Sequence, residues 1–371
     1  MNSLVIPLAG FGKRFLKEGY TQTKPLIHAG KKTIIEWALS SVEIDNNTQI
    51  IFVVREDQCI INGLDAFLKK ICPKSKIVKL NQPTRGSLET VLMACNEIDL
   101  DGELFIHTSD ICLPVPFNLN NRFKNNDINS FTVTFKANNP AYSYCKLKPG
   151  TTSYIEFMIE KEVVSQLANV GIYGFRSASD FIEKAKFVVK NNILVKDEFY
   201  ISSVFSLFFE QKALVLSCFV DEVHIIGTPN ELDFFSRYVW KTMNPKSIGF
   251  VSDHSGFSFK EKLRNLFEED GYITTDFGCF SLNDCDYSDY VPVACQALNN
   301  GEVDMIIGSC ISGQGVNISA NHCTNIISVN PSDADSLAIA RKHNCPNFIS
   351  FASKNWDPLD SFNAFKLIYN D

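Results

Sequence analysis

A short apolar run that ends in a glycine turn opens the chain, and it constrains the fold more than any other feature. Residues 4–8 are apolar without helical spacing, which predicts a buried strand. Gly10 and Gly12 then allow a tight turn in which backbone N–H groups can approach a phosphate chain. Arg14 and Lys24 add two fixed positive charges to the same loop. The stretch is therefore predicted to bind a nucleoside triphosphate.

Strand-like and helix-like segments alternate along the N-terminal part of the chain. Strands are expected over residues 49–54, 76–80 and 104–108, and helices over residues 34–42, 64–71 and 87–96. This alternation predicts an α/β fold with a mostly parallel sheet that helices cover on both faces. Ligands should then bind beyond the carboxyl ends of the strands.

A glycine pair after a strand is also typical of tight turns that bind no ligand. The residues around the pair are therefore needed to distinguish a nucleotide-binding turn from an ordinary one. The chain reads Ala9-Gly10-x-Gly12-x-Arg14-Phe15, then Gly19-Tyr20, then Lys24-Pro25-Leu26-Ile27. This pattern resembles the sugar-phosphate nucleotidyltransferase family, and in particular its NDP-sugar pyrophosphorylases of capsule and heptose type. The resemblance implies a Rossmann-like, GT-A-like domain with Arg14 and Lys24 as catalytic residues. It also implies nucleotide contacts from Leu8, Ala9, Gly10 and Gly12.

Two further strand ends carry candidate chemistry. Gln82 follows one strand and has an amide that can both donate to and accept from a base edge, while Gly86 allows close approach. In the resembled family this loop holds the nucleobase, although a plain turn with a helix cap would look the same. Asp110 follows another strand, and its carboxylate can hold Mg²⁺, which prefers hard oxygen ligands. The family places its metal-binding Asp there, although Asp110 could also cap a turn.

The resemblance continues into the region that would bind the sugar phosphate. Glu160 and Lys161 look like the family's clamp, in which the Lys meets phosphate and the Glu takes sugar hydroxyls. Gly171 lies in a segment that resembles the family's strand beneath the sugar. One departure concerns the metal, because many members have a second metal-binding Asp where this chain has Ile226. Either Asp110 and the substrate phosphates hold the metal, or another carboxylate substitutes.

The first domain is expected to end near residue 240, where a second series of strands and helices follows. Residues 241–246 are polar with a Pro and are expected to form a linker between a domain of residues 1–240 and one of residues 247–371. A new strand begins at residue 247, a helix is expected over residues 260–270, and further strands and helices alternate after it. The second part is therefore predicted to be a smaller, doubly wound α/β domain.

This second part resembles the ribose-5-phosphate isomerase B family and its galactose-6-phosphate isomerase relatives. The matching pieces are Asp253-His254-x-Gly256, Asp276-Phe-Gly278, Asp286-Tyr287, Cys310-x-Ser312-Gly313-x-Gly315, Ala320-Asn321 and Ala340-Arg341-x-His343-Asn344. The resemblance implies that Cys310 moves a proton between C1 and C2 of an open-chain sugar phosphate, with Ser312 and His343 also catalytic. It implies sugar-phosphate contacts from Asp253, His254, Gly313, Gly315 and Asn321.

The second part also departs from its family at cationic positions. The family's Lys and Arg are replaced by His322 and Ile327, and its Gly-Ser-Arg reads Ala-Ser-Lys, ending at Lys354. A pocket without these cations should bind a sugar phosphate weakly or bind something else. The alternative is a retained dimerisation module, since members of this family commonly dimerise.

Composition excludes several classes of function. The net charge of −7 argues against a nucleic-acid binder, which usually shows a basic surplus. Twelve Cys without Cys-x-x-Cys or zinc spacing suggest reduced thiols in a cytoplasmic protein, and no apolar stretch has membrane-spanning length. We therefore expect a Mg²⁺-dependent nucleotidyltransferase that acts on a nucleoside triphosphate and a sugar or alditol phosphate for a surface polysaccharide, and that forms a homodimer or tetramer. The alternatives are an isomerase as the main activity, or a binding scaffold whose sites have decayed.

Overall fold

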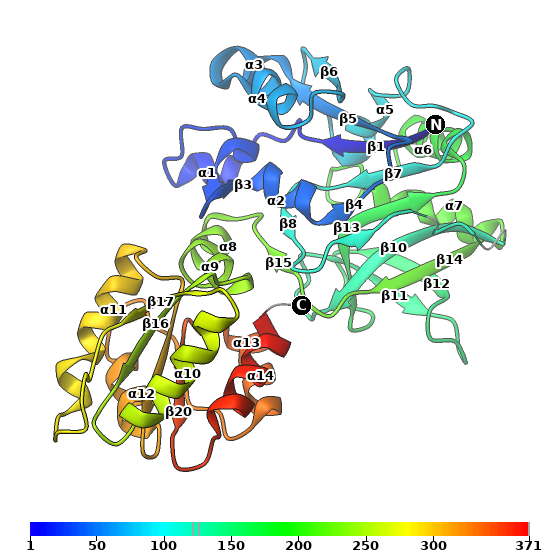
Figure 1. Cartoon of the computed structure of the whole chain (residues 1–371). Coiled ribbons are helices and arrows are strands. Elements are labelled where there is room, and N and C mark those ends of the chain that lie inside the picture. Colours follow the sequence, from blue (N-terminus) through cyan, green and yellow to red (C-terminus); the bar gives the residue numbers. More distant parts are fainter. Residues whose placement is uncertain (121, 125–126, 370–371) are drawn as a thin grey trace. The chain divides into compact units, whose positions relative to one another are not determined.

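The N-terminal unit is built on a nine-stranded sheet. A computed structural model describes residues 1–120, 122–124 and 127–369, and the chain forms two compact units, Met1–Leu232 and Asp233–Asp371 (Figure 1). One half of the first sheet is parallel, in the order β7-β1-β5-β6. Its strands are β1 (Asn2–Pro7), β5 (Thr48–Arg55), β6 (Lys76–Leu80) and β7 (Leu104–His107). They alternate with helices α2 (Ile34–Ser40), α3 (Glu56–Asn62), α4 (Leu64–Ile71) and α5 (Ser87–Leu92). The sequence predicted α2, α4 and α5 but not α3.

The other half of this sheet is largely antiparallel, which the alternation did not predict. Strand β13 (Leu167–Phe175) pairs antiparallel with β7 and with β10 (Ile128–Lys136). Strands β11 (Ser143–Leu147) and β12 (Ile155–Glu160) extend one edge, and β14 (Leu214–Phe219) pairs parallel with β10. Helices α6 (Ala178–Lys190) and α7 (Phe205–Glu210) complete this half.

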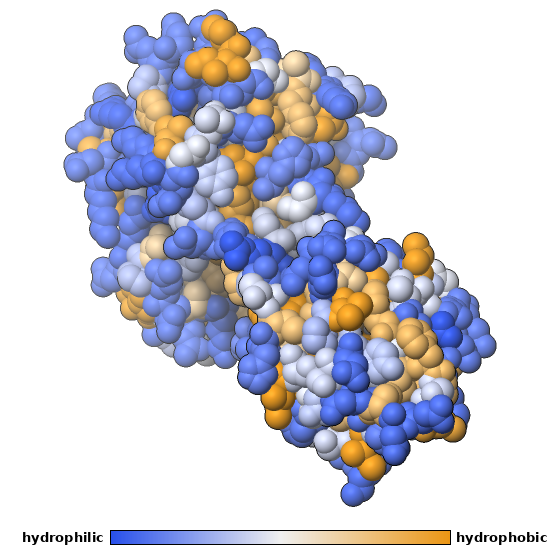
Figure 2. All heavy atoms as spheres, turned by 90° about the vertical axis from the view of Figure 1, so that its left-hand side faces the viewer, coloured by the Kyte–Doolittle hydropathy of each residue, from blue (hydrophilic) through white to orange (hydrophobic). Residues whose placement is uncertain are grey.

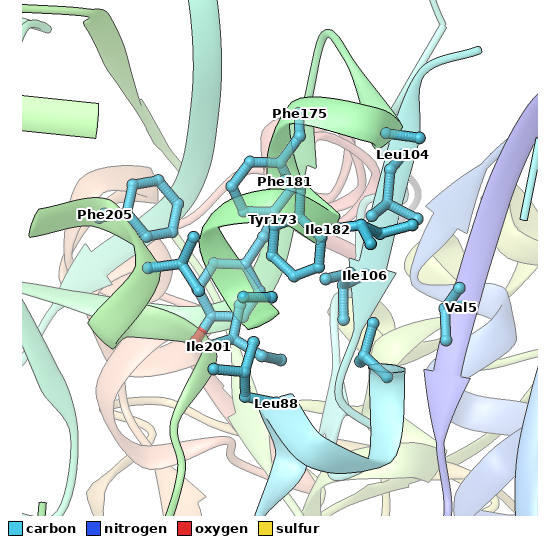
Figure 3. Packing of buried hydrophobic residues seen from close by; sticks show 14 of the residues in the cluster. Val5, Leu88, Leu104, Ile106, Tyr173, Phe175, Phe181, Ile182, Ile201 and Phe205 are labelled. Atoms are coloured by element: carbon cyan, nitrogen blue, oxygen red, sulfur yellow. The ribbon is translucent and has the colours of Figure 1, made fainter. Parts of the chain in front are cut away.

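The sheet is buried on both faces, and β1 shows why its sequence is apolar throughout. Val5 packs into one core cluster, whereas Leu4 and Ile6 pack into a second cluster. Since neighbouring residues of a strand point to opposite faces, a strand buried on both sides reads as a continuous apolar run. Figure 3 shows the first cluster, in which Phe175 and Phe181 pack beside the strand residues, with ring centroids 4.4 Å apart.

The second unit has a five-stranded sheet in which every pair is parallel, in the order β17-β16-β18-β20-β19. The strands are β16 (Ser247–Ser252), β17 (Ile273–Asp276), β18 (Met305–Cys310), β19 (Ser328–Val329) and β20 (Phe348–Ala352). The helices are α10 (Phe257–Glu269), α11 (Val291–Asn300), α12 (Gln314–Asn321), α13 (Ala334–Asn344) and α14 (Pro358–Tyr369). Neighbouring residues Phe250 and Val251 enter different core clusters, so the predicted doubly wound α/β domain is confirmed.

Helical segments join the two units. Helix α8 (Pro229–Phe234) continues into a π-helical turn at Phe235–Val239 and then into α9 (Trp240–Met243). The first residues of the linker predicted over residues 241–246 are therefore helical. The position of the boundary between two functional domains stays a prediction.

The surface in Figure 2 is largely hydrophilic, with hydrophobic side chains gathered at separate places. Within the described part of the chain, no helix is long and apolar enough to cross a membrane.

Candidate active sites

A cavity of about 530 Å³ lies at the carboxyl ends of β1 and β7, where ligands of such sheets bind. The chain segments that line it come from distant parts of the N-terminal unit. They are residues 7–15, Lys24 and Pro25, residues 84–87, Thr90, residues 108–110, Glu198 and Gly227. The predicted nucleotide residues Leu8, Ala9, Gly10, Gly12 and Gly86 and the predicted catalytic residues Arg14, Lys24 and Asp110 are thus brought together.

The glycine turn presents backbone donors to this cavity. Gly12 has a φ of 62°, and a Cβ atom there would lie 3.3 Å from the Cβ atom of Lys24. The N–H groups of residues 9–12 have no hydrogen-bond partner among the residues that the structure describes. Arg14 is exposed on the short helix α1 (Lys13–Lys17) and makes no hydrogen bond or ion pair within the described residues. These free donors and this free charge suit a phosphate chain.

Two residues that the sequence did not single out hold the turn in place. Gln58 is buried, and its Nε2 donates to the carbonyl oxygen of Gly10 at 3.3 Å and to Oγ1 of Thr23 at 2.8 Å. Nη1 of Arg55 donates to the carbonyl oxygen of Ala9 at 3.4 Å. Both side chains donate hydrogen bonds to carbonyl oxygens of the turn, so they do not compete with a ligand for its N–H groups. Only their positions, Arg55 at the end of β5 and Gln58 in α3, could have pointed to this role.

Lys24 and Asp110 form an ion pair at the cavity, with Nζ of Lys24 3.1 Å from Oδ2 of Asp110. The Asp110 side chain is 38% exposed, so its carboxylate can be reached from the cavity. Burial alone would raise the pKa of Asp110, but the charge of Lys24 and hydrogen bonds from Lys24 and Thr108 lower it below its usual value. Asp110 is therefore held as a carboxylate.

Ile226, which stands where many members of the resembled family have a second metal-binding Asp, lies beside Asp110. Strand β15 (His224–Ile225) pairs with β8 (Ile111–Cys112), and the N–H of Ile226 donates to the carbonyl oxygen of Asp110 at 2.8 Å. The Ile226 side chain is fully buried. Within the described residues, no group of three or more His, Cys, Asp or Glu side chains could hold a metal ion. Among the described residues, the carboxylates that line the cavity are Asp110 and Glu198, and Asp110 is the one bonded to Ile226 through the backbone.

The loop predicted to hold the base is fixed against a second segment. The N–H of Phe199 donates to the carbonyl oxygen of Arg85 at 2.8 Å, and that of Leu88 donates to the carbonyl oxygen of Phe199 at 3.1 Å. Gly86 has a φ of 145°, and a Cβ atom there would lie 2.6 Å from the backbone nitrogen of Phe199. Gln82 is exposed and is not among the residues that line the cavity, so its contact with a base stays a prediction.

The predicted sugar-phosphate residues form a hydrogen-bonded chain that reaches the cavity. Nζ of Lys161 bonds to the hydroxyl of Tyr200, which donates to Oε2 of Glu198 at 2.5 Å. Oε2 of Glu160 accepts from Oγ of Ser202 at 2.6 Å. Glu198 lines the cavity, whereas Glu160 and Lys161 do not. Tyr200, for which the sequence predicted no role, therefore connects Lys161 to a wall of the cavity.

Gly171 lies on β13 behind the cavity wall. Its φ is 96°, and the Oγ1 and Cβ atoms of Thr108 occupy the space that a side chain at Gly171 would need. The N–H of Thr108 donates to the carbonyl oxygen of Gly171 at 2.9 Å. Gly171 thus supports the segment that carries Asp110, and its predicted contact with the sugar stays untested.

In the second unit, Cys310 ends strand β18 and is buried, with 3% of its surface exposed. A hydrogen-bonded chain leads to it from the end of β16. Oδ1 of Asp253 accepts from Oγ of Ser255 at 2.6 Å and from the N–H of Gly256 at 2.9 Å. The N–H of Ile311, next to Cys310, donates to the same Ser255 hydroxyl oxygen at 3.0 Å. Asp253 therefore fixes the loop that carries Cys310.

The glycine turn after Cys310 begins helix α12. Gly313 has a φ of 69°, and a Cβ atom there would lie 2.7 Å from Oδ1 of Asn330. Nδ2 of Asn330 donates to the carbonyl oxygen of Ser312 at 3.1 Å, and the ring of Tyr287 occupies the space beside Gly315. The predicted residues Ser312, Gly313 and Gly315 are thus gathered beside Cys310, and Asn330 is an additional residue that holds them.

Other predicted residues of this site serve local contacts or lie exposed. Nδ1 of His254 is 2.9 Å from the carbonyl oxygen of Cys285. The side-chain amide of Asn321 donates to the carbonyl oxygen of Ser328 at 3.0 Å and accepts from the Ser328 N–H at 3.0 Å, which joins α12 to β19. His343 is exposed in the last turn of α13, and within the described residues it forms no hydrogen bond with Cys310.

Comparison with known proteins identifies the second unit. The pattern of the family described as Ribose/Galactose Isomerase matches residues 248–363. Ribose-5-phosphate isomerase B of Escherichia coli (strain K12) is 35% identical over 109 residues, which cover 29% of this chain and 73% of that protein. The chain belongs to the ribose/galactose isomerase family.

Within this isomerase-family domain, the three replaced cationic positions differ in their surroundings. His322 is exposed, and Ile327 donates its N–H to Oδ1 of Asn347 at 2.8 Å. Lys354 is exposed, and its N–H donates to the carbonyl oxygen of Ile311 at 3.2 Å. Lys354 therefore keeps a cation next to the loop that carries Cys310.

The first unit resembles solved structures in its fold. The nucleoside-diphosphate-sugar pyrophosphorylase from Vibrio cholerae RC9 superposes with a TM-score of 0.57 at 24% identity, covering 63% of this chain and 99% of that one. The predicted Rossmann-like nucleotidyltransferase fold is confirmed by this likeness.

Proposed function

We propose that the N-terminal unit is a nucleotidyltransferase that joins a nucleoside triphosphate to a sugar or alditol phosphate. The products would be a nucleoside-diphosphate sugar or alditol and pyrophosphate. The observation that carries this proposal is the cavity of about 530 Å³, in which the four N–H groups of residues 9–12 and the guanidinium of Arg14 have no partner among the described residues. A surface polysaccharide as the destination of the product is supported by the sequence resemblance alone.

The chemistry needs positioning and charge neutralisation more than covalent help. A phosphate oxygen of the acceptor forms a bond to the α-phosphorus, and the bond between the α-phosphorus and the bridging oxygen breaks as pyrophosphate leaves. Arg14 and the N–H groups of the turn would hold the triphosphate and stabilise the charge of the leaving group. Lys24 would hold the nucleotide phosphates, and Lys161 would hold the acceptor phosphate. The two lysines would thereby offset the repulsion between these negatively charged groups.

The residues at the cavity fit a magnesium ion. Mg²⁺ is usually held by one or two carboxylates together with substrate phosphates and waters, and Asp110 supplies one carboxylate at the cavity wall. The buried Ile226 supplies none, so the phosphates would complete the set. When bound, the ion would neutralise the negative charge that develops on the phosphate oxygens.

Pyrophosphate release tests the proposal. The full chain is incubated with Mg²⁺, each of ATP, CTP, GTP, UTP and dTTP, and a panel of hexose, heptose, pentose and alditol phosphates. Release with one nucleotide and one acceptor, reduced at least about a hundredfold in Lys24→Ala, is the expected result. Lys17→Ala, on the neighbouring helix α1 but outside the cavity lining, is the matched control. Absence of release from every pair would contradict the proposal.

Aldose–ketose isomerisation of a sugar phosphate is a second candidate function, which the family membership and the fixed position of Cys310 favour. The thiolate would remove the proton at C2 of the open-chain aldose, and the proton would return to C1 of the enediolate. Exchange of substrate hydrogen with deuterium from the solvent, followed by NMR, tests this step. Cys310→Ser should abolish the exchange and leave pyrophosphate release unchanged. Persisting exchange in this variant would contradict the role of Cys310.

A homodimer or tetramer through the isomerase-family domain is also part of the proposal. Exposed apolar side chains on the contacting helices α11 and α12, such as Val293 and Ile318, support it. Sedimentation equilibrium of the wild type and of Val293→Glu/Ile318→Glu measures whether these side chains hold copies together.

A further inference from the structure

The ion pair between Lys24 and Asp110 occupies the place where a divalent cation would bind. Nζ of Lys24 lies 3.1 Å from Oδ2 of Asp110, and the ammonium group neutralises the carboxylate of this residue, whose backbone carbonyl accepts from the N–H of Ile226. An ammonium group and a metal ion compete for the same carboxylate oxygens, because both need them as the source of negative charge. The free protein thus shows an internal cation at this point.

The surroundings of this ion pair leave few other ligands for a metal. Ile226 is buried and apolar, and Oε2 of the other cavity carboxylate, Glu198, accepts the hydroxyl of Tyr200. No group of three potential metal-binding side chains exists within the described residues. A metal ion that entered without phosphates would have to displace Lys24 and would gain only one carboxylate.

A triphosphate changes this balance. Its charge offers Lys24 a new partner, and Lys24 already lines the cavity together with Arg14, which has no partner in the part of the chain that the structure describes. When Lys24 turns to the phosphates, Asp110 becomes available to the cation that the triphosphate carries. Thermodynamic coupling of this kind is reciprocal, so the metal also strengthens binding of the triphosphate.

We propose that Lys24 closes the metal site of the nucleotide-free protein by pairing with Asp110, so that the divalent cation binds only together with a triphosphate. This inference rests on the proposed function, since it concerns the same cavity, but it predicts binding rather than turnover. It makes the counterintuitive prediction that removal of a positive charge needed for activity improves metal binding in the free protein.

Binding of Mn²⁺, followed by the EPR signal of the free ion, tests the proposal without nucleotide. Lys24→Met keeps the length of the side chain and removes its charge, and it should bind Mn²⁺ about tenfold more tightly than the wild type, within the usual range of coupled sites. The double variant Lys24→Met/Asp110→Asn should lose this gain. Equal binding by the wild type and Lys24→Met would overturn the proposal.

A second comparison does not depend on the stability of the Lys24 variant. Asp110→Asn alone should leave nucleotide-free Mn²⁺ binding unchanged, because Asp110 is already neutralised by Lys24. With inorganic tripolyphosphate present, the same variant should retain about tenfold less Mn²⁺ on ultrafiltration than the wild type. Weaker nucleotide-free binding in Asp110→Asn would also overturn the proposal. If the chain transfers no nucleotide, the proposed function fails, while these binding results still decide the inference.

Discussion

The N-terminal cavity and the region around Cys310 use their polar groups in opposite ways. At the cavity, Arg14 and the N–H groups of residues 9–12 have no partners within the described residues. Around Cys310, the carboxylate of Asp253 and the hydroxyl of Ser255 are engaged with the backbone that carries the thiol. Free donors and charges are available to a ligand, whereas engaged ones stabilise the fold. The difference predicts that substitutions at the cavity change turnover and that substitutions near Cys310 change stability.

The largest expected effect tests the cavity half of this comparison. Arg14→Ala should lower the rate of pyrophosphate release by about two to three orders of magnitude, because the charge developing on the leaving group loses a partner. The melting temperature should stay unchanged, since Arg14 has no partner within the described residues to lose. Steady-state kinetics and calorimetry measure the two quantities. A large loss of stability without loss of rate would reverse the comparison.

The second prediction concerns the backbone of the cavity, whose substitution should change stability, in contrast to the side chain of Arg14. Gly86→Ala should lower the free energy of unfolding by about 2–3 kcal/mol, because φ is 145° and the added Cβ atom would meet the backbone of Phe199. Gly10→Ala is the matched control, since nothing lies within 4 Å of a Cβ atom at Gly10. Chemical denaturation of both variants measures the difference. Equal stability would show that the loop adjusts freely.

The third prediction tests the engaged side chains around Cys310. Asp253→Ala should lower the free energy of unfolding by about 2 kcal/mol, because Ser255 and the N–H of Gly256 lose their acceptor. The control is Asp284→Ala, whose side chain is fully exposed and should contribute little. Calorimetry of the full chain measures both. If the two variants unfold alike, the polar network near Cys310 is not a stabilising one.

The smallest expected effect concerns the chain that reaches from Lys161 to the cavity. Tyr200→Phe keeps the ring, over which Nζ of Lys161 lies 4.4 Å from the centroid, and removes the hydroxyl. The KM for the acceptor phosphate should rise about tenfold, the net value of one hydrogen bond to a charged group, while the KM for the nucleotide stays unchanged. A change confined to the nucleotide KM would place Tyr200 on the other side of the reaction.

Much of the candidate chemistry could be predicted because it depends on residues close together in the sequence. The turn at Gly12, with its φ of 62°, and the cations Arg14 and Lys24 follow β1 directly, and the structure places them at one cavity. Gln58 and Tyr200 could not be predicted in the same way. Gln58 reaches Gly10 from 48 positions away, and Tyr200 reaches Lys161 from 39 positions away. Such contacts leave no local pattern in the chain.

The sequence alone determined that β1 and β16 are strands, since burial on both faces requires continuous apolar runs, and it determined the turn that follows β1, since turns require particular residues. It also determined the two families that the halves resemble. Only the tertiary structure decided which charges are free and which are engaged. Lys24 is paired with Asp110 across 86 positions, whereas Arg14 remains without a partner in the described chain. The physical reason is that pairing depends on distances of a few ångströms between side chains, which the folded backbone sets and the order of residues does not.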